Sequence, residues 1–346
     1  MDEQVLEKLG WGPPFLEAWR ARAVAGEEPA RITADYGVEY GLSTLHGDLR
    51  ATLPGKLRMA LRKGEALRPV VGDWVAFEPR LQEGTSVIQA VLPRRTQLAR
   101  KAAGRATEEQ VVAANVDVVF LVSALTSDLN PRRLERYLSV AWDSGAQPVL
   151  VLTKTDLSED VAAARERIAA LAPDVPLHTV SSFSGDGLDT LAPYLTGSTT
   201  IALIGSSGVG KSTLINRLLG SARQEVGAVR EDYKGRHTTT HRELFVLPGG
   251  GLVIDTPGMR ELGLVENEEG VRLSFSDIEQ LAAGCRFSDC RHEREPGCAV
   301  QQAVKDGQLE PERLESFHKL SHETANPGPR EAPSRGKPEA PKKRGR

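Results

Sequence analysis

The feature that most constrains this chain is the stretch TTIALIGSSGVGKSTLINRLL at residues 199–219. It predicts a buried strand, a glycine-rich turn and an amphipathic helix. Glycines let backbone N–H groups converge on an anion without an intruding Cβ, and a helix N-terminus adds partial positive charge. The spacing G-x-x-x-x-G-K-S between a strand and a helix therefore predicts a phosphate-binding P-loop rather than a turn that binds nothing. The residues assigned to it are Gly205, Ser206, Ser207, Gly208, Val209, Gly210, Lys211, Ser212 and Thr213.

A second phosphate element is Asp255-Thr-Pro-Gly258, directly after the apolar run GLVI. In a P-loop site the lysine, here Lys211, reaches the β- and γ-phosphates, and the next hydroxyl, here Ser212, ligates Mg²⁺. An aspartate at the end of the neighbouring strand holds the same Mg²⁺ through water, and the Gly258 N–H contacts the γ-phosphate. We therefore predict a Mg²⁺–nucleotide site with Ser212 and Asp255 at the metal.

Base selection is assigned to residues 153–156, Thr-Lys-Thr-Asp, at another predicted strand end. A carboxylate such as Asp156 accepts two hydrogen bonds from guanine N1–H and the exocyclic amine, a donor pair that adenine lacks. Lys154 is expected along the base plane, and the backbone of Ser181 and Ser182 near the guanine O6. The pattern predicts GTP over ATP. GTPases usually have an Asn at the position of Thr153, and the amide of that Asn ties this loop to the P-loop. Thr153 lacks the amide donor, so the strength of nucleotide binding is not fixed by this pattern.

The order of these elements along the chain is unusual. In an ordinary GTPase the P-loop comes first, whereas here the base-reading residues 153–156 and 181–182 precede residues 205–213. The two termini of a domain often lie close together. A chain in which the original termini are joined and new termini are made at another loop can therefore form the same sheet. We interpret this order as a circularly permuted GTPase domain.

Between the two phosphate elements lies a segment that predicts a mobile switch loop. Residues 227–240 contain two of the chain's glycines, no apolar core residues and three threonines, whose hydroxyls can reach Mg²⁺ and the γ-phosphate. Many GTPases keep a water-positioning Gln after the Gly258 position, but this chain has Met259, so intrinsic hydrolysis should be slow. We hypothesise that His237 or a partner group positions the attacking water, and we assign catalytic roles to His237, Lys211 and Thr239.

All three cysteines of the chain lie within one short segment. The spacing Cys285-x₄-Cys290-x-His292-x₅-Cys298 supplies three thiolates and one imidazole. Four such ligands fill a tetrahedral Zn²⁺ sphere and leave no open position, which predicts one structural zinc. The alternative is three free cysteines beside an unrelated histidine.

Composition changes along the chain predict its domains. Short strand-like runs with turn residues favour an OB-type β-barrel over residues 30–100, where frequent Lys and Arg indicate either a solvated face or RNA contact. Alternating strands and helices over 101–265 indicate a parallel sheet covered on both faces, with ligands at the strand ends. We expect a short packing extension over 1–29, a zinc-binding helical domain over 266–323 and a disordered basic tail over 324–346.

Bulk properties narrow the functional classes. The 346 residues carry a formal net charge of −3, so binding of nucleic acid would require local basic patches rather than the charge of the whole molecule. A run of about 18 apolar residues is absent and the N-terminus lacks a leader pattern, which predicts a cytoplasmic protein without a membrane partner.

Seven stretches together form a more specific pattern. They are QVVAANVDVVFLV (110–122), NPRRLERYL (130–138), TKTD (153–156), GSSGVGKSTLIN (205–216), GRHTTTHRELF (235–245), DTPGMREL (255–262) and CRFSDCRHEREPGCAV (285–300). In this permuted order and with this zinc spacing, the chain resembles the ribosome small subunit-dependent GTPase A family (RsgA, also called YjeQ or EngC). The resemblance covers roughly residues 30–323.

This resemblance implies an N-terminal OB-fold, a circularly permuted GTPase domain and a C-terminal zinc domain. It also implies hydrolysis of GTP to GDP and phosphate, stimulated by the 30S ribosomal subunit, late in 30S maturation and with release of assembly factors. The flanking domains would contact 16S rRNA. Carried over to this sequence, residues 205–213 bind phosphate, Lys154 and Asp156 bind guanine, and the three cysteines with His292 bind zinc. We expect a monomer with no DNA partner.

Two alternatives from other classes stay open at this point. Met259 and Thr153 favour a zinc-stabilised RNA-binding module whose nucleotide site is a switch with negligible turnover. An ATP-dependent P-loop enzyme is disfavoured by Asp156.

Overall fold

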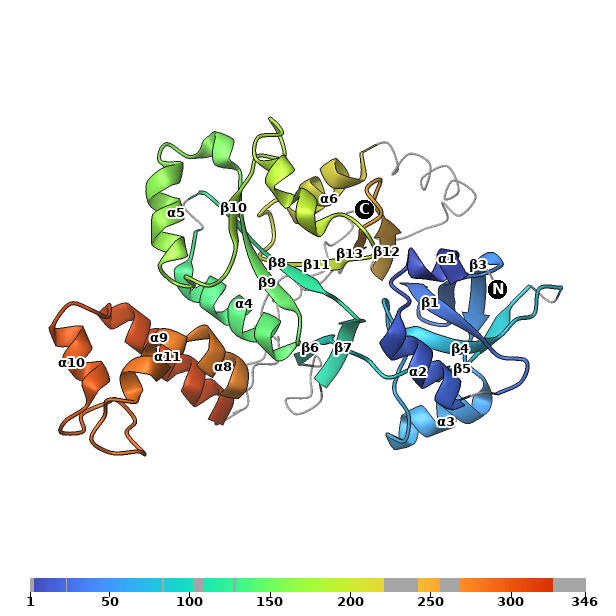
Figure 1. The fold of residues 1–346 in the computed structure, drawn as a ribbon, viewed down its shortest axis with the longest axis horizontal. Coiled ribbons are helices and arrows are strands. Elements are labelled where there is room, and N and C mark those ends of the chain that lie inside the picture. Colours follow the sequence, from blue (N-terminus) through green and yellow to red (C-terminus); the bar gives the residue numbers. More distant parts are fainter. Residues whose placement is uncertain are drawn as a thin grey trace, which may run out of the picture.

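The computed structural model describes residues 3–22, 24–82, 84–101, 109–126, 129–220, 242–255 and 268–325. Three units follow one another along the long axis of the molecule (Figure 1). A small barrel (blue) leads into a central sheet flanked by helices (green to yellow), and a helical unit (orange to red) lies at the far end. The central unit therefore contacts both of the others.

The N-terminal unit is a five-stranded barrel of OB type. Its strand order is β1-β2-β3-β5-β4, the pairing of β1 with β4 closes it, and β3 pairs with β5 in parallel. Trp74 and Phe77 fill its core, and Trp11 and Phe15 from the N-terminal segment pack on the Trp74 ring at 4.7 and 5.8 Å between centroids. The elements are α1 (Glu3–Glu7), α2 (Pro13–Arg22), β1 (Glu28–Asp35), β2 (Tyr40–Thr44), β3 (Gly47–Thr52), α3 (Gly55–Lys63), β4 (Trp74–Glu78) and β5 (Ser86–Val91).

The central unit is a sheet of order β10-β9-β8-β11-β13-β12, parallel except at β12. Its strands β8, β9 and β11 are continuous apolar runs buried along nearly their whole length, as strands covered on both faces must be. The elements are β6 (Gln97–Lys101) and β7 (Glu109–Ala114), which form a separate hairpin, β8 (Val118–Ala124), α4 (Pro131–Asp143), β9 (Gln147–Thr153), η1 (Thr155–Leu157), α5 (Val161–Ala169), β10 (Leu177–Thr179), η2 (Leu188–Tyr194), β11 (Thr200–Ile204), α6 (Lys211–Leu219), β12 (Arg242–Val246) and β13 (Leu252–Asp255).

The barrel and the central sheet are continuous through one strand pair. β1 pairs with β12 antiparallel, with Ala34 opposite Glu243 and Asp35 opposite Arg242, so that one 11-stranded sheet runs through both units. β12 is the strand that follows the expected switch loop in the chain. The backbone of the barrel is therefore hydrogen-bonded to the element next to that loop.

Arg31 of β1 joins the same two units and is almost fully buried. Its guanidinium donates to the carbonyl oxygens of Leu9, Gly72 and Asn115 and, at 2.9 Å, to the Thr200 hydroxyl of β11. Burial lowers the pKa of Arg31 to about 10, so the group stays charged at neutral pH. A buried cation with this many acceptors fixes the barrel against the first residue of the P-loop strand.

The C-terminal unit packs against α4 of the central unit (Figure 1). Gly270 is needed there because a Cβ would overlap Asp143 and the Ser139 carbonyl of α4. Its small core surrounds Phe275, which is fully buried. Residues 326–346, expected in the basic tail, lie outside the described residues. The elements are α8 (Glu268–Ser274), α9 (Ser276–Ala282), α10 (Ala299–Lys305) and α11 (Pro311–Ala325).

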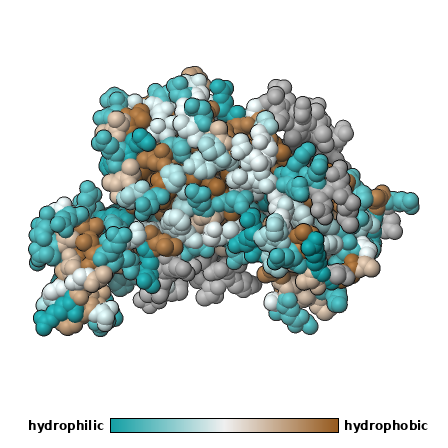
Figure 2. Space-filling view, in the orientation of Figure 1, coloured by the Kyte–Doolittle hydropathy of each residue, from teal (hydrophilic) through white to brown (hydrophobic). Residues whose placement is uncertain are grey.

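On the face drawn in Figure 2, hydrophobic side chains form small separate patches among hydrophilic ones. In the described part of the chain, no helix combines the length and the apolar character that crossing a membrane requires.

Candidate nucleotide site and metal centre

The predicted P-loop connects β11 to α6 as expected. Gly208 and Gly210 have φ of +79° and +100°, which residues with a side chain rarely adopt, and a Cβ at Gly205 would overlap the Val122 carbonyl of β8. Ser212 and Thr213 are exposed at the start of α6. The loop thus leaves its backbone bare at a helix N-terminus, the geometry that favours an anion.

Two cationic side chains reach the second residue of this loop. The Lys211 ammonium donates to the carbonyl oxygens of Gly205 and Ser206, the latter at 2.6 Å. The Arg133 guanidinium of α4 donates to the Ser206 hydroxyl at 2.6 Å, and the Tyr137 hydroxyl lies 3.4 Å from the same oxygen. Positive charge is therefore concentrated beside the proposed phosphate site. Arg133 and Tyr137 were not predicted to contact this loop, although both stand in the NPRRLERYL stretch.

The two base-reading segments meet at the C-terminal ends of β9 and β10. Ser181 is buried, and its hydroxyl donates to Asp156 Oδ1 at 2.5 Å. Lys154 adopts a left-handed conformation with φ of 59°, which turns the chain sharply after β9. The Ser182 hydroxyl is buried and has no hydrogen-bond partner among the described residues. An exposed carboxylate next to an unsatisfied buried hydroxyl fits a polar ligand edge at this position.

Thr153 makes the link that its residue type was expected to lack. Its hydroxyl donates to the Val209 carbonyl of the P-loop at 2.5 Å, and it lies 3.3 Å from the Ser123 carbonyl of β8. Thr153 is buried, so this bond is shielded from water. A short hydroxyl therefore ties the base-reading loop to the phosphate loop in place of a longer amide.

Substituting Thr153 with valine keeps the shape of the side chain and removes this donor. The Val209 carbonyl then loses a buried partner, at a cost of about 1 kcal/mol, so we expect GDP to bind roughly fivefold to tenfold more weakly. Isothermal titration of GDP in the presence of Mg²⁺ measures the change. If GDP affinity stays unchanged while the melting temperature falls, the bond serves stability alone.

Several predicted residues are only partly placed by the structure. Asp255 ends β13, beside the P-loop strand, and is partly buried. Gly258 and Met259 lie outside the described residues, as do His237 and Thr239 of the expected switch loop. Their proposed roles at Mg²⁺ and the γ-phosphate stay predictions.

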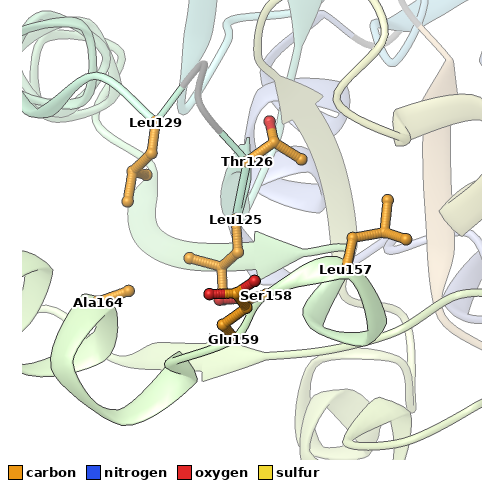
Figure 3. Close-up of a pocket in the computed structure, with 7 residues that line it drawn as sticks. All are labelled: Leu125, Thr126, Leu129, Leu157, Ser158, Glu159 and Ala164. Carbon is orange, nitrogen blue, oxygen red and sulfur yellow. The ribbon is translucent and has the colours of Figure 1, made fainter.

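A pocket of about 290 Å³ lies beside the base-reading loop, between the end of β8 and the start of α5 (Figure 3). Three leucines and one carboxylate contribute to it, but none of its lining residues is cationic or belongs to the P-loop. A phosphate finds no favourable partner there. This pocket therefore does not suit a nucleotide phosphate, and residues 205–213 stay the predicted phosphate site. The lining residues are Leu125, Thr126, Leu129, Leu157, Ser158, Glu159 and Ala164.

The four predicted zinc ligands converge in the C-terminal unit. One ligand atom from each of Cys285, Cys290, His292 and Cys298 lies within 4.8 Å of all the others. The Cys285 and Cys298 sulfurs are 3.9 Å apart, and His292 Nδ1 lies 3.6 and 3.5 Å from them. Tetrahedral Zn²⁺ with ordinary bond lengths requires roughly 3.8 Å between two sulfurs and about 3.6 Å between sulfur and nitrogen.

The surroundings of this cluster also suit a metal. The backbone N–H of Ala299 lies 3.3 Å from the Cys285 sulfur, and that of Gln301 lies 3.4 Å from the Cys298 sulfur, as donors to thiolates do. The Gln301 side chain donates to the His292 carbonyl at 2.6 Å and so holds the histidine backbone. The donor set and its spacing therefore fit one four-coordinate ion, and zinc suits three thiolates and an imidazole best.

The fold and the site together define a class of protein. The P-loop strand β11 lies between β8 and β13, while the base-reading strands β9 and β10 precede it in the chain. Such an arrangement is a circularly permuted P-loop GTPase, here with an OB-type barrel before it and a Cys₃His helical unit after it.

Comparison with known proteins gives the family. The RsgA GTPase family model matches residues 91–265. The small ribosomal subunit biogenesis GTPase RsgA of Opitutus terrae is 49% identical over 92% of this chain and 90% of its own, and that of Methanosarcina acetivorans is 50% identical over 74% and 70%. The chain belongs to the RsgA GTPase family and is a GTP-hydrolysing enzyme.

Solved structures agree on the fold. YjeQ from Thermotoga maritima superposes with a TM-score of 0.64 at 27% identity, covering 86% of this chain and 99% of its own. YloQ, described as a circularly permuted GTPase, superposes with a TM-score of 0.63 at 24% identity, covering 89% and 98%. These structures confirm the permuted fold predicted from the order of the motifs.

Proposed function

We propose that this chain is a GTPase of small ribosomal subunit biogenesis. It hydrolyses GTP to GDP and phosphate, is stimulated by the 30S subunit and acts late in 30S maturation, where hydrolysis releases assembly factors. The observation that carries the proposal is the bond from Thr153 to Val209, which joins the base-reading loop to the P-loop in one site. The names of the relatives supply the ribosomal partner. We propose the cytoplasm as its place of action, in line with a role in small-subunit assembly.

Within this proposal each part of the site has a task. Residues 205–213 bind the phosphates, Ser212 and Asp255 hold Mg²⁺, and Asp156 with Ser181 and Ser182 reads guanine. The Ser181 hydroxyl supports this role because its bond to one Asp156 oxygen orients the carboxylate. The zinc centre is structural because its four protein ligands leave no open position.

The flanking units are proposed to contact 16S rRNA. On the barrel, helix α3 projects four basic side chains into solvent and has no fully buried residue. Such a helix suits sequence-independent contact with phosphates, whose strength falls as salt rises. We propose that the protein acts as a monomer and that the units divide near residues 30, 100 and 265. The exposed basic residues of α3 are Lys56, Arg58, Arg62 and Lys63.

Steady-state hydrolysis of GTP and ATP, with and without purified 30S subunits, tests the proposal. We expect slow GTP turnover that rises by about an order of magnitude or more with 30S, while ATP is not hydrolysed. The stimulation should weaken with increasing salt because docking on RNA releases counterions. GTP turnover that does not respond to 30S would remove the ribosomal role and leave the nucleotide site in place.

The same assay examines the proposed water-positioning role of His237. Replacing it with alanine should lower 30S-stimulated turnover by about 100-fold, because general-base assistance contributes at least that much. GDP affinity should not change. Unaltered stimulated turnover in His237→Ala would assign the attacking water to a group supplied by the partner.

A further inference from the structure

Phe183 is an unusually exposed aromatic residue. With 87% of its surface in solvent, it exceeds every other large hydrophobic residue in the described part of the chain, the next being Val38 at 73%. Burying a phenylalanine side chain is favourable, so a ring held in water at a fixed position is available to a ligand that covers it.

The backbone around Phe183 is well defined although its ring is not packed. The Phe183 N–H donates to the Ser181 hydroxyl at 3.2 Å, and the Ser181 N–H and carbonyl bond with Asp186 and Gly185 at 2.9 Å each. Gly187, at φ of +72°, packs so closely that a Cβ would overlap the Thr179 carbonyl. The loop therefore holds Phe183 in place and exposes its side chain.

The same loop leads directly to the carboxylate assigned to guanine. The Ser181 hydroxyl that accepts from the Phe183 N–H donates to Asp156 Oδ1 at 2.5 Å. Two hydrogen bonds thus separate the Phe183 backbone from the group that would bind the edge of the base. Ser182, which lies between Ser181 and Phe183 in the chain, carries the buried unpaired hydroxyl.

We propose that Phe183 is a nucleotide-binding residue whose ring stacks on the face of the purine while Asp156 binds its edge. This inference rests on the proposed guanine site. The two contacts do different work, because edge hydrogen bonds select the base, whereas every base has a π-face and stacking is tolerant of its identity. The protein thus gains affinity at Phe183 and selectivity at Asp156.

GDP and GTP affinities of four variants test this division. Replacing Phe183 with alanine should weaken both nucleotides by roughly 10-fold to 100-fold, the range measured for aromatic–base stacking. Phe183→Tyr, which keeps the ring, should stay within about twofold of the parent. Val38→Ala, which truncates an exposed apolar residue on the barrel, should change neither affinity. The ratio of XTP to GTP affinity should stay constant in Phe183→Ala and rise in Asp156→Asn.

A Phe183→Trp variant adds a direct optical readout, since stacking on GDP should quench and shift its emission. Normal GDP affinity in Phe183→Ala, with the expected shift toward XTP in Asp156→Asn, overturns the stacking role and leaves the proposed function standing. Normal GDP affinity with weakened binding to 30S subunits assigns the ring to the partner and also overturns it. A parent protein that binds no guanine nucleotide overturns the proposed function itself.

Discussion

Removal of zinc from this protein with a strong chelator should unfold residues 285–305 and leave the central sheet folded. The core of the C-terminal unit is small, and structural zinc contributes on the order of 10 kcal/mol or more to such units. The loop between Cys285 and Cys298 contains no helix or strand, so beyond local hydrogen bonds, such as those that Glu295 accepts from backbone N–H groups, the metal is its main restraint. Hydrogen exchange monitored by mass spectrometry should show lost protection in α10 and retained protection in β8 and β11.

Metal analysis provides the control for this experiment. The parent protein should contain one zinc per chain, and Cys298→Ala should contain none. His318→Asn should keep its zinc, because His318 lies outside the ligand cluster and bonds only to the Arg291 carbonyl among the described groups. A parent protein without zinc whose segment 285–305 is fully protected would contradict the metal assignment.

The second large effect is expected at Arg313, whose buried ion pair with Glu135 joins the C-terminal unit to the central unit. Arg313 of α11 is 8% exposed and donates to Glu135 of α4 at 2.8 Å and to Asp277 of α9 at 2.7 and 2.9 Å. Burial raises the pKa of Glu135, and the Arg313 charge opposes this rise. Arg313→Met removes the cation and leaves a buried carboxylate without compensation. We expect the C-terminal unit to lose about 3–5 kcal/mol of stability.

The chain contains a matched control between the same two helices. Arg132 of α4 and Glu315 of α11 form an equally short pair at 2.7 Å, but their side chains are 45% and 68% exposed. Arg132→Ala should therefore cost at most about 1 kcal/mol. Urea unfolding followed by hydrogen exchange in α9 and α11 compares the two variants. Equal losses in both variants would contradict the argument from burial.

Helix α4 provides side chains both to the P-loop residue Ser206 and to Arg313 of the C-terminal unit. Arg133 and Tyr137 of α4 contact the P-loop hydroxyl, while Glu135 contacts the C-terminal unit. These residues alternate along the helix, so they face different neighbours. α4 is thus packed between the P-loop and the C-terminal unit.

The sequence predicted the local structure of the P-loop and of the cysteine cluster better than the contacts between distant segments. The strand, the glycine turn and the helix around Lys211 form where they were expected, and the Cys₃His cluster converges as its spacing indicated. Thr153 shows where residue type misleads, because the usual role of asparagine there suggested a missing link. The missing information was the distance from β9 to the P-loop, which is short enough for a hydroxyl to bridge.

The sequence alone determined the local features of this protein: the P-loop, the zinc ligands and the permuted order of the motifs. These features depend on backbone conformation and ligand spacing within short segments, which local residue patterns record. Only the tertiary structure decided which distant residues meet. The partners Thr153 and Val209, Arg133 and Ser206, and Glu135 and Arg313 are 56, 73 and 178 residues apart. No periodicity encodes such pairs, because they follow from sheet order and helix docking, which the whole chain establishes together.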